Sequence, residues 1–134
     1  MNRASTLAAL TLAASALGTP AMAEMITKTS PHSVSQTMDR LQAAVEGAGA
    51  TLFARVDHAA GAAGVDMDLR PTELMIFGNP KLGTPPMKTN QTAGLDLPLR
   101  VLAYEDAEGV VHVTYRDPAT LAADHGLPAD APYL

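Results

Sequence analysis

The fold class of this 134-residue chain is indicated most clearly by residues Leu95–Asp117, LDLPLRVLAYEDAEGVVHVTYRD. Two runs in which apolar and polar residues alternate flank a polar turn at Asp106–Gly109. Alternation with a period of two indicates strands, and a turn this short joins neighbouring strands that run in opposite directions. The stretch therefore predicts an antiparallel hairpin.

Three more strands are predicted before this hairpin. They are Met25–Thr29, Thr51–His58 and a strand around the apolar run Leu74–Phe77, whose continuous apolar character indicates burial on both faces. The later strands follow one another without long crossovers, so we expect most of them to pair in the antiparallel sense.

A long helix is predicted between the first two strands. Ser33 and Gln36 have the spacing of a capping box, and apolar residues recur every three or four positions thereafter. A short helix is predicted after Asp117, with Gly126 beyond its end, and the Gly- and Pro-rich segment 80–94 is expected to be a loop. The order strand, helix, four strands, helix predicts a two-layer α+β domain, with a mostly antiparallel sheet, one long helix packed on it and a short C-terminal helix.

The first residues have the pattern of a secretory signal peptide. Arg3 precedes a short apolar run, and Ala21-Met22-Ala23 fits the usual cleavage pattern. We expect cleavage after Ala23, which leaves residues 24–134 as a single α+β domain in the periplasm or outside the cell. No later run is apolar enough to span a bilayer, so we expect no membrane contact after cleavage.

Composition and motifs narrow the function. The whole chain has a formal net charge of −5 and no basic cluster, so the domain is not expected to bind nucleic acid. Without cysteine it has neither a thiol nucleophile nor a thiolate metal site. Nucleophile-elbow, phosphate-loop and dinucleotide motifs are absent, and the four histidines lack metal-ligand spacing, so we expect no cofactor and assign no metal site.

Asp57 and His58 are adjacent at the end of a predicted strand, and two interpretations stay open. A carboxylate beside an imidazole can transfer protons or bind a metal ion, here with His125 across a pocket. Alternatively, Asp57 caps the Ala-rich turn that follows, and His58 is a partly buried loop residue. His125 lies near the end of the last predicted helix, where it suits the helix dipole.

The segment Phe77–Thr84, FGNPKLGT, follows the most apolar strand. Gly78 permits close backbone approach, Pro80 restrains Asn79, and the Asn79 amide can bond to the loop or to a ligand. A plain chain reversal and a binding site at the strand end both explain this turn.

These pieces together resemble the domain of unknown function 302 family. FGNP at 77–80, GT at 83–84 and DLPL at 96–99 occur in the family's order, and the resemblance covers about residues 29–127. It implies a compact α+β fold similar to the TATA-binding-protein-like arrangement, often as a homodimer, and it carries over no reaction. The matching positions are Asp57, His58, Ala62, Phe77, Gly78, Asn79, Pro80, Gly83, Thr84, Met87, Asp96, Leu97, Pro98, Tyr115 and His125.

The leading hypothesis is a small exported, non-catalytic binding or accessory module for a small ligand or metal ion. Its pocket would combine Asp57-His58, the 77–84 segment and 96–98. One alternative is an enzyme that uses Asp57 and His58; another is a structural protein that dimerises through a sheet edge or an exposed apolar face. The candidate ligand-binding residues are Asp57, His58, Phe77, Gly78, Asn79, Pro80, Thr84, Asp96, Pro98 and His125.

Overall fold

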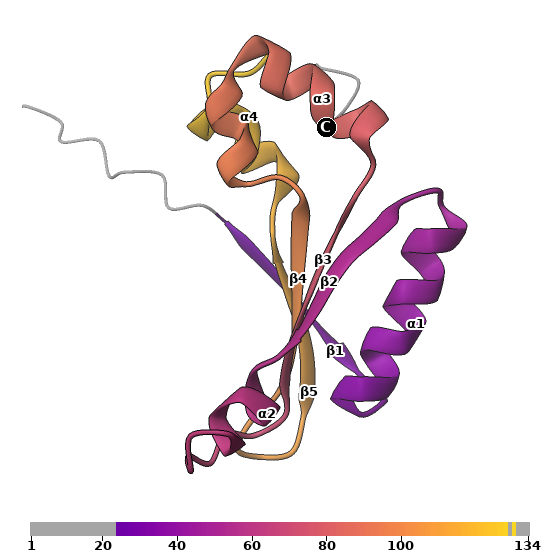
Figure 1. Cartoon of the computed structure of the whole chain (residues 1–134), viewed down its shortest axis with the longest axis vertical. Helices are drawn as coiled ribbons and strands as arrows, with labels where there is room; N and C mark the ends of the chain where they lie inside the picture. Colours follow the sequence, from indigo (N-terminus) through magenta and orange to yellow (C-terminus); the bar gives the residue numbers. More distant parts are fainter. Residues whose placement is uncertain (1–23, 129, 131–134) are drawn as a thin grey trace, which may run out of the picture.

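A five-stranded antiparallel sheet, in the order β1-β5-β4-β3-β2, forms the centre of the molecule (Figure 1). The computed structural model describes residues 24–128 and 130, and the predicted signal peptide lies outside them. The strands are β1 (Met25–Ser30), β2 (Thr51–Asp57), β3 (Thr72–Gly78), β4 (Leu99–Glu105) and β5 (Val111–Arg116). The helices are α1 (Val34–Gly47), α2 (His58–Ala63), α3 (Pro80–Thr89) and α4 (Pro118–Asp124), with a 3-10 turn η1 (Gln91–Leu95). The predicted α+β class is confirmed.

The predicted hairpin forms the middle of the sheet. β4 pairs with β5 on one side and with β3 on the other, and β1 pairs with the outer side of β5. β1 and β2 are the two edge strands, so the chain between them must cross the whole sheet. That crossing is α1, which therefore covers one face of the sheet.

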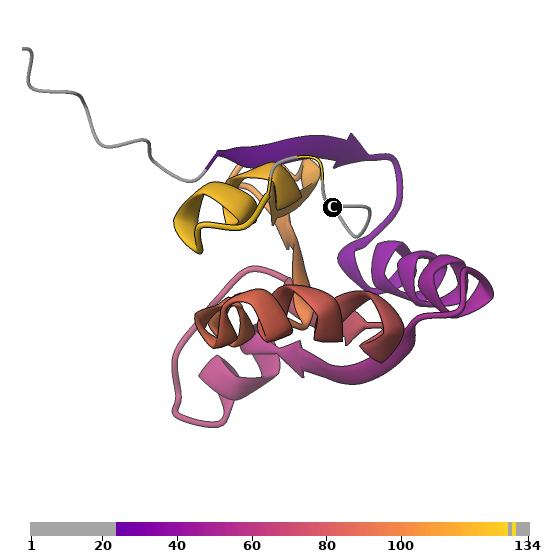
Figure 2. The same ribbon diagram turned by 90° about the horizontal axis from the view of Figure 1, so that it is seen from above.

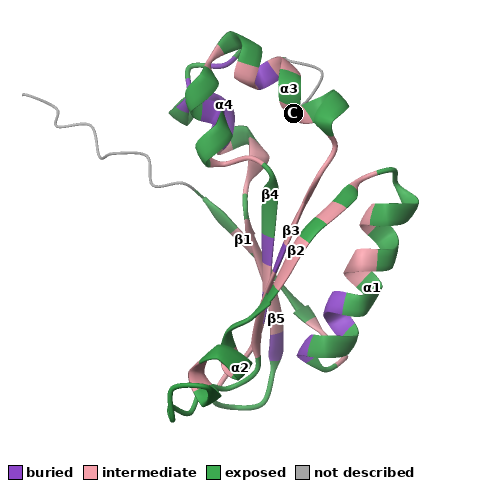
Figure 3. Ribbon diagram, in the orientation of Figure 1, coloured by how far each residue is buried: buried purple, intermediate pink, exposed green. Residues whose placement is uncertain are grey.

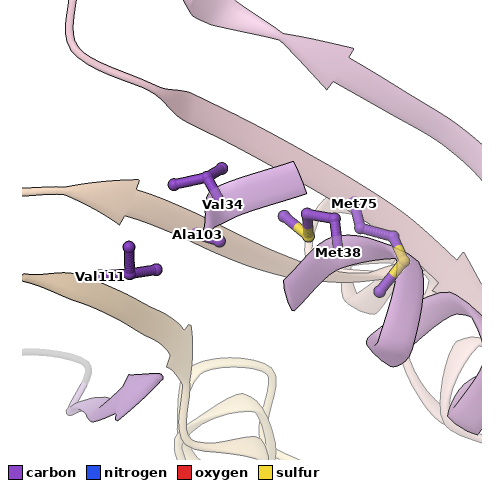
Figure 4. Close-up of a cluster of buried hydrophobic side chains, with 5 residues drawn as sticks. All are labelled: Val34, Met38, Met75, Ala103 and Val111. Carbon is purple, nitrogen blue, oxygen red and sulfur yellow. The ribbon is translucent and has the colours of Figure 1, made fainter. Parts of the chain in front are cut away.

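α1 begins as predicted and packs through its apolar stripe. Ser33 Oγ accepts a hydrogen bond from the Gln36 N–H at 3.2 Å, and Gln36 Oε1 accepts one from the Ser33 N–H at 3.4 Å. Met38 of α1 and Met75 of β3 are both fully buried and belong to one cluster between α1 and the sheet. Truncating such a buried methionine to alanine typically costs about 2–5 kcal/mol, so this cluster holds α1 on the sheet. Figure 4 shows the cluster of Val34, Met38, Met75, Ala103 and Val111.

Arg55 adds a polar connection between α1 and the sheet. Its Nε donates to Glu73 Oε1 at 2.6 Å, and its Nη1 donates to Asp39 Oδ1 at 2.7 Å and to Gln42 Oε1 at 3.1 Å. The hydrogen bond to Glu73, followed by that to Asp39, raises the pKa of Arg55 above its ordinary value. A permanently charged guanidinium therefore joins β2, β3 and α1.

The segment 80–94 is helical, which corrects the predicted loop. Asn79 Oδ1 accepts the Lys81 N–H at 2.9 Å, and Pro80 occupies the first helical position, where its missing N–H removes no helical bond. Asn90 closes α3 and caps η1, because its Oδ1 accepts the Thr92 N–H at 3.1 Å. The two asparagine caps thus bound helices in a segment whose glycines and prolines have low helix propensity.

α3, η1 and α4 form a helical cap at one end of the sheet (Figures 1 and 2). α4 begins as predicted, with Asp117 Oδ1 accepting the Ala119 N–H at 2.9 Å, and Gly126 follows it with a φ of 62°. Figure 3 shows buried residues both in this cap and where α1 meets the sheet. The buried residues of the cap are Ala93, Leu121, Ala122 and Leu127, with Met87 and Leu97 packed against them.

Candidate ligand-binding site

A hollow of ≈ 490 Å³ lies between the helical cap and the C-terminal end of α1. The end of β3 lines it, together with α3, the segment 97–99 and the start of α4. Hollows of about 300–1,000 Å³ commonly hold small organic ligands. We call it the apolar hollow because nearly all of its lining side chains are apolar. The predicted site residues that line it are Phe77, Gly78, Asn79, Pro80, Thr84 and Pro98.

The FGNP turn both reverses the chain and lines this hollow. A Cβ atom at Gly78 would lie 3.3 Å from Pro98 Cβ, a tight contact that glycine avoids where the end of β3 packs on the segment before β4. Asn79 caps α3, and its Nδ2 also donates to the Gly49 carbonyl at 3.4 Å. The turn and the hollow are therefore built from the same residues.

α3 is a wall of the hollow with incomplete helical hydrogen bonding. Proline has no N–H, so Pro85 cannot bond to the Lys81 carbonyl and Pro86 cannot bond to the Leu82 carbonyl. The residues three and four positions after Leu82 are both prolines, so its carbonyl lacks either ordinary helical donor. α3 is held mainly by its two capping asparagines and by packing on η1.

A second hollow of ≈ 340 Å³ adjoins the first and contains charged side chains. Arg116 Nη1 donates to Asp96 Oδ1 at 2.9 Å, and its Nη2 donates to Asp124 Oδ2 at 3.3 Å. Arg100 Nη2 lies 3.6 Å from the same Asp96 oxygen. We call it the polar hollow for these side chains; Asp96 and Asp124 face the arginines, and Asp117, which also lines it, caps α4 by accepting the Ala119 N–H. The two hollows share Leu99, Pro118 and Leu121.

His125 joins the polar hollow to the helical cap. Its side chain is 8 % exposed, with Nε2 2.7 Å from Asp96 Oδ2 and Nδ1 2.9 Å from Thr92 Oγ1. Its backbone carbonyl accepts a hydrogen bond from Asn90 Nδ2 at 2.7 Å. His125, which was expected to interact with the helix dipole, is therefore buried and connects the end of α4 to η1.

The order carboxylate, imidazole, hydroxyl in this cluster is one that can activate a nucleophile. Thr92 lines neither the apolar nor the polar hollow, and its hydroxyl also donates to Asn90 Oδ1 at 2.9 Å. A hydroxyl bonded within the cap and outside both hollows is poorly placed to attack a bound ligand. The arrangement favours a structural connection.

Asp57 and His58 lie at the other end of the sheet, which corrects the predicted pocket. Asp57 pairs with Glu73 at the start of β3, whereas Gly78 at the end of β3 pairs with Thr51. Two neighbouring antiparallel strands finish at opposite ends of the sheet. The 7 residues of β3 separate these two ends by about 20 Å. Figure 1 accordingly shows α2 and the helical cap at opposite ends.

The local structure of this pair agrees with the capping alternative. Asp57 Oδ1 accepts the Ala60 N–H at 2.9 Å and so caps α2. His58 is exposed rather than partly buried. His125 lies in the cap at the far end, so the structure does not assemble the acid–base site that combined it with Asp57 and His58.

A second imidazole–carboxylate pair lies at the turn between β4 and β5. His112 Nε2 is 2.7 Å from Asp106 Oδ2, and the His112 ring stacks on Tyr104 with centroids 5.2 Å apart. Asp106 Oδ1 accepts the N–H groups of Val110 and Glu108. The hydrogen bond from His112, and then that from Val110, lower the pKa of Asp106 below its ordinary value. Neither hollow reaches this pair.

Several lining residues were missed by sequence analysis. They include Val45 near the end of α1 and Leu121 of α4, which come from helices far from the FGNP turn in sequence. A signal was present for α3: Leu82 and Pro86, like Gly83 and Met87, lie four positions apart, as on one face of a helix. The prolines obscured that spacing.

The chain is a two-layer α+β domain with an apolar, ligand-sized hollow beneath a helical cap. Within residues 24–128 and 130, no three His, Asp or Glu side chains are grouped so that they could hold a metal ion. No helix of the described part is long and apolar enough to cross a bilayer.

The chain belongs to the family described as "Domain of unknown function DUF302", whose model matches residues 26–133. The fold is similar to the crystal structure of an uncharacterised conserved DUF302 protein from Bacillus stearothermophilus. The TM-score is 0.71, at 18 % sequence identity, over 78 % of this chain and 82 % of that one.

Curated relatives are longer proteins. The chain is 50 % identical over 103 residues to the fluoride-specific ion channel FluC 1 of Brucella suis and to FluC 2 of Brucella melitensis. The match covers 77 % of this chain, 41 % of the first protein and 38 % of the second. The chain therefore spans about two fifths of the length of these relatives.

Proposed function

We propose that this protein is a small exported, non-catalytic binding module whose ligand occupies the apolar hollow. One observation carries the proposal: residues from α1, β3, α3 and α4 converge around ≈ 490 Å³ at one end of the sheet. Phe53 and Leu82 border this space while 54 % and 56 % exposed. Apolar surface gains about 25 cal/mol per Å² when it is covered, so a ligand here would bind favourably.

Export rests on the signal-peptide pattern that ends at Ala23. We expect the protein recovered from the periplasm or the medium to begin at Glu24. Intact-protein mass spectrometry of the two fractions tests this, and a chain in the cytoplasm that retains Met1–Ala23 would contradict export.

The binding function is tested by native mass spectrometry of protein purified without detergent from its own cells. We expect an additional mass that is released on denaturation. Leu82→Asp should abolish it, because a carboxylate at the mouth opposes an apolar ligand. Leu95→Asp is the matched control, since Leu95 is 78 % exposed and does not line the hollow.

A weakly held ligand would be lost during purification, so the same proteins should also be titrated with an organic-solvent extract of the cells. NMR spectra of the amides around the hollow report binding. Without an additional mass or shifts at these amides, or with equal effects of both variants, the proposal fails.

The curated relatives favour a second candidate function, a module that acts on a membrane ion-transport protein. Sequence similar to this chain makes up about two fifths of proteins named fluoride-specific ion channels, which leaves about three fifths outside the match. Covalent linkage of two segments in relatives is consistent with a functional association between them.

This candidate is tested on the relatives' own channel. The segment matching this chain would be deleted from the Brucella suis protein, and fluoride flux would be measured in vesicles with and without purified chain added. If the deletion changes the fluoride flux and the added chain restores it, the result supports an accessory role. Identical flux in the intact, shortened and supplemented channels contradicts it.

A further inference from the structure

Resting on the proposed binding function, we propose that the apolar hollow selects an uncharged, hydrocarbon-like ligand. The class of ligand follows from three properties of the hollow: the charge of its lining, the hydrogen bonds its polar groups already make, and the character of its mouth.

The described lining contains no Lys, Arg, Asp, Glu or His side chain. A charged ligand entering this space would lose water without gaining an ionic partner. Such transfer of an unpaired charge costs several kcal/mol after relaxation, whereas transfer of a hydrocarbon group is favourable. The lining therefore favours uncharged ligands over charged ligands of the same shape.

Polar side chains of the lining offer few hydrogen bonds. Both ends of the Asn79 amide are engaged, Oδ1 by the Lys81 N–H at 2.9 Å and Nδ2 by the Gly49 carbonyl at 3.4 Å. The Thr84 hydroxyl has no hydrogen-bonding partner among the described residues, so it can serve a single ligand hydroxyl or carbonyl. A ligand with several polar groups would find few side-chain partners for them in this lining.

The mouth of the hollow is apolar as well. Phe53 of β2, Leu82 of α3 and Leu99 of β4 line it with exposed fractions of 54 %, 56 % and 37 %. Side chains of this kind at a mouth favour entry of an apolar molecule and are covered when it binds.

The adjoining polar hollow does not supply a site for a charged head group. Arg116 is bonded to Asp96 at 2.9 Å and to Asp124 at 3.3 Å, and Arg100 also faces Asp96, at 3.6 Å. Both arginines there face carboxylates, and the third carboxylate of the lining, Asp117, accepts the Ala119 N–H at 2.9 Å. An anionic group on the ligand would have to displace an existing pair, and a cationic group would compete with the two arginines.

The test uses three naphthalene derivatives of nearly equal shape: naphthylmethanol, naphthoate and naphthylmethylammonium. The chain has no Trp, so their fluorescence can be followed with little protein background. We expect the alcohol to bind at least about tenfold more tightly than either ion, which corresponds to about 1.4 kcal/mol. Leu82→Asp should abolish binding, Thr84→Val should weaken the alcohol alone, and Leu95→Asp should change nothing.

The outcomes separate this inference from the function on which it rests. Equal binding of the three probes, or preference for an ion, overturns the ligand class. So does failure of all three to bind when the cellular protein carries a releasable mass, and the binding function then stands. If no probe binds and the cellular protein carries no releasable mass, both the ligand class and the binding function are contradicted. Loss of the alcohol signal as a dimer forms would assign the hollow to a second copy of the chain and overturn the proposal.

Discussion

His125 Nε2 lies 2.7 Å from Asp96 Oδ2, and this contact joins the end of α4 to the residue that follows η1. Asp96 simultaneously accepts a hydrogen bond from Arg116 of β5. The Asp96 carboxylate therefore connects the helical cap to β5. Because the apolar hollow lies between this cap and α1, the contact also maintains the shape of the hollow.

Removing the imidazole should destabilise the whole domain. In His125→Ala, Asp96 and Thr92 lose partners in a site where the imidazole is 8 % exposed, so we expect a loss of about 2 kcal/mol in the free energy of unfolding. His58→Ala is the control, because His58 is exposed in α2. Urea unfolding of both variants measures the difference, and equal midpoints would contradict a structural role for His125.

Two glycines near the hollow should respond in opposite directions to alanine. Gly78→Ala places a Cβ atom 3.3 Å from Pro98 Cβ, and we expect a loss of about 1 kcal/mol. A Cβ atom at position 83 lies within α3 and meets its nearest neighbour outside the helix backbone, Leu97 Cδ1, only at 4.0 Å, so Gly83→Ala should gain about 0.5–1 kcal/mol. Thermal unfolding tests both, and a stabilised Gly78→Ala would show that the turn tolerates a side chain.

Pro85 limits the stability of α3. Pro85→Ala restores an N–H that can bond to the Lys81 carbonyl, and we expect a net gain of about 1–2 kcal/mol after the greater freedom of the unfolded chain is included. The new amide at position 85 should be protected from hydrogen exchange. Pro80→Ala is the control, because the first helical position has no helical acceptor to regain. Unprotected exchange at position 85 would mean that α3 is open there for another reason.

Asp106 should contribute a pH-dependent part of the stability. Its pKa is lowered from the ordinary 3.8, chiefly by the His112 hydrogen bond. The stabilisation is therefore fully present above 3.8 and is lost as the pH falls through the lower folded-state pKa. Asp106→Asn should remove this loss, whereas Glu108→Gln should retain it. Carboxyl NMR titration checks the direction, and a midpoint for Asp106 above 3.8 would contradict it.

Much of the fold could be predicted because its signals are local. The capping box at Ser33, the alternation in the hairpin and the Asp117 cap each act within a few residues, so their geometry is readable in sequence. The loop predicted for 80–94 was wrong because the asparagine caps and the packing of α3 and η1 outweigh the low helix propensity of glycine and proline.

The candidate site was predictable only in part. The FGNP turn and Pro98 meet because β3 and β4 are neighbours. Asp57, by contrast, ends β2, which runs antiparallel to β3, so it lies at the start of β3 and far from the turn. Residues from α1 and α4 joined the lining through packing that no local pattern reports.

The class of domain, the positions of most strands and helices, and the family of the chain can be read from the order of its residues. Alternation, helical spacing and caps are properties of adjacent residues, and they survive in a linear reading. Folding is needed to show which strand ends meet, that His125 is buried against Asp96 across 29 residues of chain, and where the apolar hollow lies. Those features arise when distant segments exclude water together, and that cooperation exists only in the folded chain.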